Sequence, residues 1–178
     1  VDHLDEMTRT EITARYRQTL QPGMKVLDLM ASWNSHLPDE LPLAVTGLGM
    51  NEAELAHNPR LAERVVQNLN EHAALPFADA AFDAVLCALS IEYLIDPLAV
   101  VREVGRVLKP GAPFVISFSD RWFPPKAIRL WSELHPFERM AFVADLLWRS
   151  GMFGNLQTES LQGRPAPLGN WRPQRRPH

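Results

Sequence analysis

The sequence predicts an α/β fold in which an open, mostly parallel sheet carries helices on both faces. Short apolar runs alternate along the chain with stretches of helical periodicity, as successive strand–helix units do. The run at residues 82–89 is short and strongly apolar, as a strand covered on both faces must be. A helix bounded by Asp96-Pro97 and Lys109-Pro-Gly111 then leads to another such run at 113–118. This order is one complete parallel crossover unit, and the right-handed rule leaves few other topologies.

The composition indicates a single soluble domain. The chain has 178 residues, of which 46% are hydrophobic and 22% are charged, and this size and balance favour one globular core. We therefore expect one domain over residues 1–162. The Pro/Arg-rich tail at 163–178 is expected to be poorly ordered. No apolar run approaches the about 20 residues that a membrane span needs.

Charge and cysteine content limit the partners that we expect. A net charge of −3 gives no general attraction to nucleic acid or to an anionic membrane, so neither is an expected partner. The sole cysteine, Cys87, lies in an apolar run and cannot form an internal disulfide, which favours a reducing, cytoplasmic location. The six histidines are scattered without ligand spacing, so we expect no metal site.

The first half of the chain is predicted to hold two helices and three strands. Within residues 4–19, apolar residues recur at approximately helical spacing among charged ones and predict a helix. Asn51 with Glu54 forms a capping-box-like start for a second helix through residue 56. Pro38 and Pro42 limit any helix between the first two strands to about one turn at 33–37. The three strands are short apolar runs, at residues 25–30, 43–48 and 65–69.

The second half is predicted to hold three further helices and three strands. Asp96 supplies an N-cap and Pro97 a first-turn proline for a helix that runs to Leu108 with an apolar face. Two more helices follow near residues 125–134 and 136–150, the second ending at Gly151. The strands are expected at residues 82–89, 113–118 and 156–161.

Topology directs attention to one edge of this sheet. In open parallel sheets the ligand lies beyond the carboxyl ends of the strands, near the point where strand order reverses. The chain segments that would meet there follow each strand in turn, at residues 28–33, 49–51, 70–72, 90–93 and 119–123.

The stretches Leu75–Cys87 and Glu103–Ser117, together with Val26-Leu27-Asp28-Leu29, resemble class I S-adenosylmethionine-dependent methyltransferases of the type 11 kind. The resemblance runs from residue 26 to about 111 and more weakly to 161. It implies a three-layer Rossmann-like methyltransferase fold with six to seven strands. It also implies S-adenosylmethionine as the cofactor and a small-molecule acceptor.

The cofactor loop departs from the family pattern. All three glycines that follow the first strand in the family are replaced here, by Met30, Ser32 and Asn34. Glycine there lets the backbone approach the cofactor and tolerates positive φ. The residues placed at the cofactor by the resemblance are Asp28, Met30, Ala31, Ser32, Trp33, Gly49, Met50, Asn51, Asn70, Glu71 and Ser90.

Several of these residues have a second interpretation. Gly49 stands where the family carries the acid that holds the ribose, so Asn51 either reaches the ribose or only caps its helix. Asn70 or Glu71 either contacts adenine or is simply a turn residue. Trp33 either stacks on a ligand or fills the hollow that the glycines would line.

The catalytic candidates follow the fourth and fifth strands. By the resemblance, Glu92 and Tyr93 are the candidates for groups near the transferable methyl group. Tyr93 would steer the substrate or face the sulfonium, or it would only cover the edge of the core. Asp120 lies in the aromatic loop after the fifth strand. Glu92, Asp120 or His135 would serve as a general base where the acceptor must lose a proton.

Two functions remain open at this point. The first is a small-molecule methyltransferase with an unusual cofactor loop. The second is a non-catalytic binding or regulatory protein on a methyltransferase scaffold that has lost cofactor binding. A nicotinamide-dependent oxidoreductase is excluded because no Gly-x-Gly-x-x-Gly follows the first strand.

Overall fold

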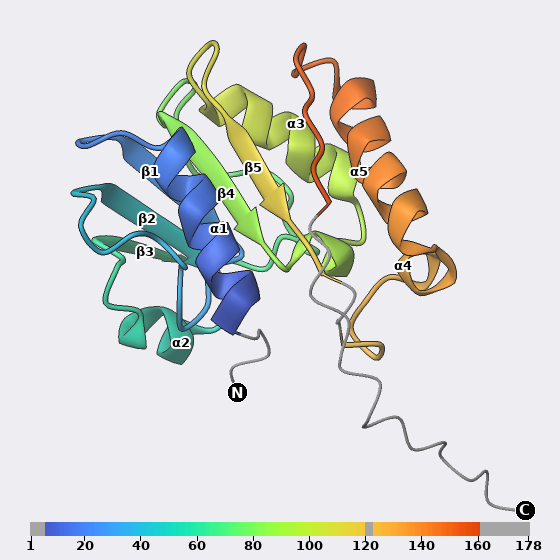
Figure 1. Ribbon diagram of the computed structural model, residues 1–178, viewed down its shortest axis with the longest axis horizontal. Coiled ribbons are helices and arrows are strands. Elements are labelled where there is room, and N and C mark those ends of the chain that lie inside the picture. Colours follow the sequence, from blue (N-terminus) through green and yellow to red (C-terminus); the bar gives the residue numbers. More distant parts are fainter. Residues whose placement is uncertain (1–5, 120–122, 161–178) are drawn as a thin grey trace, which may run out of the picture.

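A five-stranded parallel sheet forms the centre of the protein in a computed structural model, which describes residues 6–119 and 123–160 (Figure 1). The strand order is β3-β2-β1-β4-β5, so the order reverses between β1 and β4. Their bounds are β1 Lys25–Leu29, β2 Ala44–Gly49, β3 Glu63–Val66, β4 Ala84–Ala88 and β5 Phe114–Ser117. The predicted parallel α/β fold is confirmed.

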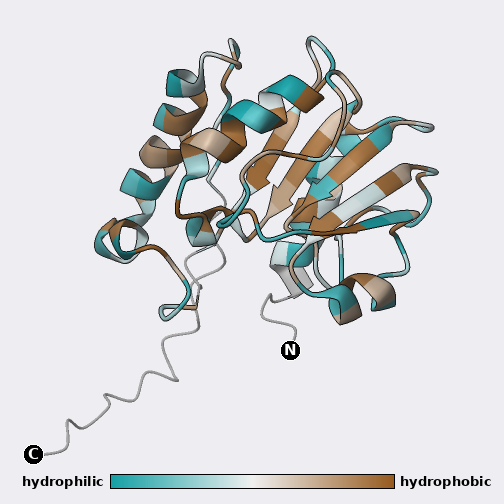
Figure 2. Cartoon of the chain, turned by 180° about the vertical axis from the view of Figure 1, so that it is seen from behind, coloured by the Kyte–Doolittle hydropathy of each residue, from teal (hydrophilic) through white to brown (hydrophobic). Residues whose placement is uncertain are grey.

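Helices cover both faces of this sheet, as predicted. Helices α1 and α2 lie on one face, and α3 and α5 lie on the other, which is turned to the viewer in Figure 2. A 3-10 helix, η1, follows β4. The helix bounds are α1 Glu6–Thr19, α2 Glu52–His57, η1 Ile91–Tyr93, α3 Pro97–Val107, α4 Arg129–Glu133 and α5 Pro136–Ser150.

Two hydrophobic cores follow from the alternation of side chains along the strands. In β1, Leu27 and Leu29 belong to the core beneath α3, whereas Val26 belongs to the core beneath α1. The fully buried indole of Trp131 extends the first core under α5. Asp28 points to the α1 side, so an ionisable group lies within the second, largely apolar core.

Helix α3 forms through the same cap and apolar face that predicted it from the sequence. Asp96 accepts a hydrogen bond from the Ala99 N–H at 3.1 Å, and Pro97 occupies the first turn. The buried face consists of valines at helical spacing: Val100, Val101, Val104 and Val107. This helix therefore forms as predicted.

Other sequence-based boundaries were wrong. The expectation of six to seven strands fails for the described residues, which form five. The third strand begins earlier, at Glu63, and ends at Val66 rather than at residue 69. No helix forms at 33–37, which is within the limit of about one turn that the prolines set. The domain limits at 162 and 163 and the tail lie outside the described residues.

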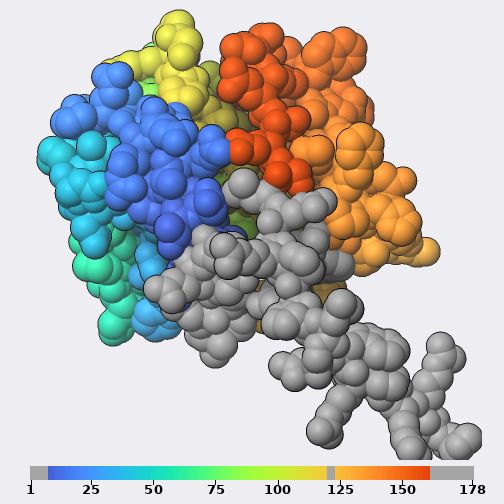
Figure 3. Space-filling model, in the orientation of Figure 1, coloured from blue at the N-terminus to red at the C-terminus, as the bar shows by residue number. Residues whose placement is uncertain are grey.

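The expected strand at 156–161 does not form in its described part, residues 156–160. Those side chains are exposed, and the segment contacts α1 through an ion pair between Glu159 and Arg15. Figure 3 shows this red segment beside the blue helix. A strand without a buried face lacks the packing that stabilises sheets, so an extended segment results.

Candidate functional site

The loop that follows β1 keeps a glycine-like turn without glycine. Met30, which replaces the first family glycine, has φ 60°, the left-handed region that side chains disfavour by roughly 1–2 kcal/mol. The third replacement, Asn34, accepts a hydrogen bond from the His36 N–H at 3.1 Å, a local Asx turn. The surrounding structure must therefore hold the loop in this conformation.

Side chains of α2 hold one part of the loop. Ser32 donates a hydrogen bond to the Glu54 carboxylate at 2.5 Å, and the Asn51 amide donates to the same carboxylate at 2.9 Å. The Asn51 carbonyl oxygen caps α2 by accepting from the N–H groups of Ala53 and Glu54. Capping, the plainer of the two roles considered for Asn51, is the one its contacts show. The Glu54 carboxylate thus accepts hydrogen bonds from the residues that follow β1 and β2. The sequence did not predict this contact with Ser32, because Glu54 also matches the capping-box pattern of its own helix.

The turn after α2 holds the rest of the loop. The fully buried Asn58 donates hydrogen bonds to the Ser32 carbonyl oxygen at 2.8 Å and to the Ser35 hydroxyl at 2.9 Å. Arg60 donates to the carbonyl oxygens of Pro38 and Leu41, each at 3.1 Å. These contacts replace the tight packing that glycines would allow.

Trp33 stands at the outside of this loop. Its ring centroid lies 5.2 Å from that of His57, and its side chain is half exposed. Trp33 therefore does not fill the hollow beneath the loop and presents an open aromatic face to solvent.

Gly49 is required by the packing of the loop against β2. A Cβ at Gly49 would lie 2.4 Å from the Ala31 carbonyl oxygen. The Ala31 N–H in turn donates to the Leu48 carbonyl oxygen at 2.8 Å. No acidic side chain fits where the family carries its ribose-binding acid, and the next residue, Met50, is exposed instead.

A group of buried polar atoms lies beneath α1, toward the carboxyl end of the sheet. It comprises the carboxyl of Asp28, whose Oδ2 atom has no hydrogen-bond partner, and the hydroxyl groups of Tyr16 and Ser117, which lie close enough for Ser117 to lower the pKa of Tyr16. Burial raises the pKa of Asp28 to about 7, although a hydrogen bond with Ser35 opposes that shift. Burial also raises the pKa of Tyr16, with the Asp28 charge adding to the effect. This group retains unused hydrogen-bonding capacity.

The loop after β3 is tied to the turn after β4. The Asn70 amide donates to the Tyr93 carbonyl oxygen at 3.0 Å, and its carbonyl oxygen accepts from the Ile95 N–H at 2.8 Å. Glu71 is exposed and accepts a hydrogen bond from Asn68 at 2.8 Å. Of the two predicted adenine contacts, Asn70 therefore joins the two loops, whereas Glu71 bonds within the loop after β3. Asn68, closer to the end of β3, was missed by sequence reasoning.

The residues after β4 meet the segment that follows β5. Ser90 donates a hydrogen bond to the Ala88 carbonyl oxygen at 2.8 Å. The Tyr93 hydroxyl accepts from the Phe123 N–H at 3.1 Å, and burial raises its pKa. Tyr93 thus links the fourth and fifth loops. Asp120 lies outside the described residues.

Glu92 is an interior group. Its side chain is buried, its Oε2 atom has no hydrogen-bond partner, and burial raises its pKa to about 7, with the Arg139 charge opposing the shift. Arg139 is itself buried, lies over the Trp131 ring at 5.6 Å and donates to the Trp131 carbonyl oxygen. The base candidate His135 is exposed at the start of α5, where its backbone N–H donates to Glu138.

Large apolar side chains are exposed along the carboxyl edge of the sheet. Each comes from the loop after a different strand, so the topology brings them to one edge. We call this set the apolar rim: Trp33, Met50, Ile95 and Phe123.

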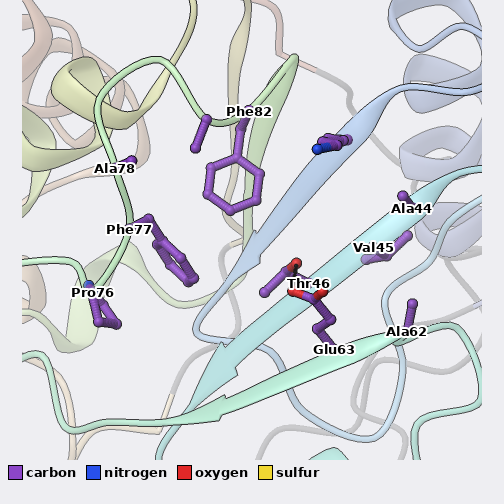
Figure 4. Close-up of a pocket in the computed structure, with 11 residues that line it drawn as sticks. Ala44, Val45, Thr46, Ala62, Glu63, Pro76, Phe77, Ala78 and Phe82 are labelled. Atoms are coloured by element: carbon purple, nitrogen blue, oxygen red, sulfur yellow. Dashed lines mark hydrogen bonds between the residues drawn. The ribbon is translucent and has the colours of Figure 1, made fainter.

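A hollow of about 350 Å³ lies elsewhere, at the amino ends of the first three strands (Figure 4). Phe77 and Phe82 form one wall, with ring centroids 4.9 Å apart. On the opposite side Thr46 donates to Glu63 at 3.2 Å. This hollow is separate from the loops described above.

Among the described residues, no group of histidine, cysteine or acidic side chains could hold a metal ion. The helices of the described part of the chain include none with the length and apolar content of a membrane span.

Comparisons with known proteins agree with this architecture. The family described as "Methyltransferase domain" matches residues 31–116, from the loop after β1 into β5. A ubiquinone/menaquinone biosynthesis C-methyltransferase of Laribacter hongkongensis is 26% identical over 156 residues, which cover 82% of this chain and 63% of that protein. This chain thus spans less than two thirds of that relative's length.

Solved structures share the fold. An S-adenosylmethionine-dependent methyltransferase from Aquifex aeolicus has a TM-score of 0.58 at 21% identity, covering 80% of this chain and 78% of that one. The [4+2]-cyclase SpnF has a TM-score of 0.59 at 19% identity, covering 79% and 56%. These structural likenesses show a shared fold, and the sequence matches show that the chain is similar to S-adenosylmethionine-dependent methyltransferases over about half of its length.

Proposed function

We propose that this protein transfers the methyl group of S-adenosylmethionine to a small, largely apolar acceptor. The observation that carries the proposal is the loop after β1, which keeps a left-handed turn at Met30 although the glycines are gone. A strained turn held by buried side chains is expected where a loop must keep a binding geometry. The buried sole cysteine supports a cytoplasmic setting.

The residues present could hold the cofactor through contacts that differ from those of the family pattern. The buried Oδ2 atom of Asp28 has no partner, and this carboxyl would receive the charged amino-acid end of the cofactor. Glu54 would replace the missing ribose acid, because its carboxylate already holds two hydrogen bonds between the ends of β1 and β2. Trp33 and Met50 offer exposed apolar surfaces to a planar base.

When bound, S-adenosylmethionine supplies a methyl group activated on sulfur. The protein's part is to place the acceptor in line with that group, and such orientation is worth roughly 7–11 kcal/mol. Tyr93 would position the acceptor from between the fourth and fifth loops. Glu92 would hold or remove a proton at its Oε2 atom, since burial sets the pKa of this carboxyl near neutrality.

The apolar rim supports an apolar acceptor. Four exposed apolar side chains at the carboxyl edge would contact an acceptor there, and covering them with apolar surface is favourable. The relative from Laribacter hongkongensis acts in quinone biosynthesis by its name, and a quinone precursor is an acceptor of this chemical class.

A specific observation favours the second function, a non-catalytic protein on this scaffold. The side chains of Asn51, Asn70 and Glu54 all form internal hydrogen bonds that a cofactor would have to displace. The [4+2]-cyclase among the structural neighbours is described by an activity other than methyl transfer. Fold likeness therefore does not decide between the two functions.

Isothermal titration calorimetry with S-adenosylmethionine and S-adenosylhomocysteine tests the proposal. We expect micromolar binding by the wild-type protein and at least about tenfold weaker binding by Asp28→Asn and by Glu54→Gln, since each loses a charge-assisted hydrogen bond. Glu52→Gln is the matched control, because Glu52 is an exposed acid in the first turn of the same helix. No binding at millimolar ligand by a folded wild-type sample would favour the non-catalytic scaffold.

A further inference from the structure

Two buried polar side chains without hydrogen-bond partners come from η1 and α4. The Oε2 atom of Glu92 is an acceptor and the indole Nε1–H of Trp131 is a donor, and neither has a partner among the described residues. Glu92 is 1% exposed and Trp131 is fully buried. Because unpaired polar atoms in the interior destabilise a fold, an unused acceptor and an unused donor in one region indicate that a polar group binds there.

Backbone hydrogen bonds hold these two residues close together. The Ile128 N–H donates to the Glu92 carbonyl oxygen at 2.9 Å, and the Ile128 carbonyl oxygen accepts from the Trp131 N–H at 3.0 Å. Their side chains also enter the same core. Burial raises the pKa of the Cys87 thiol and the Glu92 charge adds to the effect, and Cys87 and Trp131 both belong to the core beneath α3. The Arg139 guanidinium lies over the Trp131 ring at 5.6 Å, and its charge opposes the effect of burial on the pKa of Glu92.

The surroundings of this pair are apolar. The Phe118 ring packs edge-on against the Trp131 ring, with 5.2 Å between the centroids. Ile91 and Leu94, which lie on either side of Glu92 in the sequence, are buried in the same core. A ligand that reaches this region must therefore be largely apolar and carry few polar atoms.

The two unpaired atoms select the polar group of that ligand. An ether or carbonyl oxygen would accept from Trp131 and leave Glu92 unpaired, whereas an ammonium group would donate to Glu92 and leave Trp131 unpaired. A hydroxyl group satisfies both, because its O–H donates to Oε2 while its oxygen accepts from Nε1–H. Building on the function proposed above, we propose that Glu92 and Trp131 bind the hydroxyl group of a phenol-like acceptor.

The position of the pair suits an acceptor. Helix η1 follows β4 and α4 follows the segment after β5, so both come from the carboxyl edge of the sheet, where the topology places the ligand (Figure 1). Tyr93, next to Glu92, is only partly buried, and Phe123 beyond it is exposed. Helix α4 has five residues, and its N-cap position holds Ile128, whose side chain cannot accept a hydrogen bond. Such a short helix depends on packing for its stability, so it can open to admit a ring.

Phenol and toluene test the proposal, because they share the ring and differ in the hydroxyl group. Each is titrated into the isotope-labelled protein without cofactor while the indole N–H signals are followed by NMR, and Trp131→Phe identifies the Trp131 signal by its loss. We expect phenol to move the Trp131 signal downfield and to bind at least about tenfold more tightly than toluene, since it gains two hydrogen bonds. An unmoved Trp131 signal, or equal binding of the two compounds, would overturn the proposal.

Variants of Glu92 test the acceptor atom. Glu92→Leu removes the acceptor and keeps a side chain of similar size, so phenol should lose its advantage over toluene. Glu92→Gln keeps an acceptor oxygen and should retain most of that advantage. Glu71→Leu, at an exposed acid in the loop after β3, is the control and should bind phenol as the wild-type protein does. A folded Glu92→Leu protein that still prefers phenol would contradict the proposal. Because the cofactor is absent from these titrations, their outcome is independent of whether S-adenosylmethionine binds in calorimetry.

Discussion

Single residues in left-handed conformation show where this chain accepts backbone strain. Four non-glycine residues have positive φ among those described: Met30, His36, Ala80 and Leu89. Met30 and Leu89 follow β1 and β4, the two strands on either side of the point where strand order reverses. Strain at that place agrees with a binding function, because strained backbone residues cluster at active sites and ligand-binding loops.

Ala80 allows the strain to be measured without loss of packing. It is exposed and has φ 52°, so Ala80→Gly should raise the free energy of unfolding by about 0.5–1 kcal/mol. Ala78, exposed in the same loop but without positive φ, is the control, and Ala78→Gly should lower stability by a similar amount. Urea unfolding followed by circular dichroism measures both. Equal destabilisation by the two substitutions would show that position 80 is not strained.

At the scale of elements, hydrogen bonds hold the loop after β1 against helix α2 and the turn that follows α2. Hydrogen bonds from Ser32, Asn58 and Arg60 join them, and Gly49 lets the loop carbonyl approach β2. This unit explains why the family's ribose-binding acid cannot simply be restored: the loop occupies the space its side chain would need.

Gly49→Asp tests that explanation. We expect a loss of about 2–3 kcal/mol in the free energy of unfolding, because the new Cβ overlaps the Ala31 carbonyl oxygen and a carboxylate is buried. Met50→Asp, one residue later and exposed, should change stability by less than about 0.5 kcal/mol. Thermal unfolding of both variants compares them. A stable Gly49→Asp protein with tighter S-adenosylmethionine binding would show that the loop can move aside.

For the whole molecule, periodicity predicted the sheet and its helices because apolar runs and caps are local signals. The valine face of α3 and the Asn51 cap are examples. The site was less predictable. Asn70 was placed correctly after β3, but its bonds to Tyr93 and Ile95 join positions more than 20 residues apart. Glu54 was read only as a capping residue, since its contact with Ser32 arises from tertiary packing.

Two buried carboxyl groups should make the stability of the whole molecule depend on pH. Burial raises the pKa of Asp28 from 3.8 and of Glu92 from 4.5, each to about 7. Between about pH 4 and 7 the unfolded chain has therefore released these protons while the folded protein still holds them. Stability is then highest at low pH within this range, and it decreases as pH rises toward 7.

Each carboxyl is expected to remove about 2–4 kcal/mol from the free energy of unfolding by pH 7. Asp28→Asn and Glu92→Gln should each flatten the dependence, because an amide does not ionise, and the double variant should flatten it further. The exposed acid Glu71, replaced by Gln, serves as the control. Urea unfolding at intervals from pH 4.5 to 7.5 provides the measurement. A wild-type stability that rises over this range would mean that both carboxyl groups are ionised and paired in the folded protein.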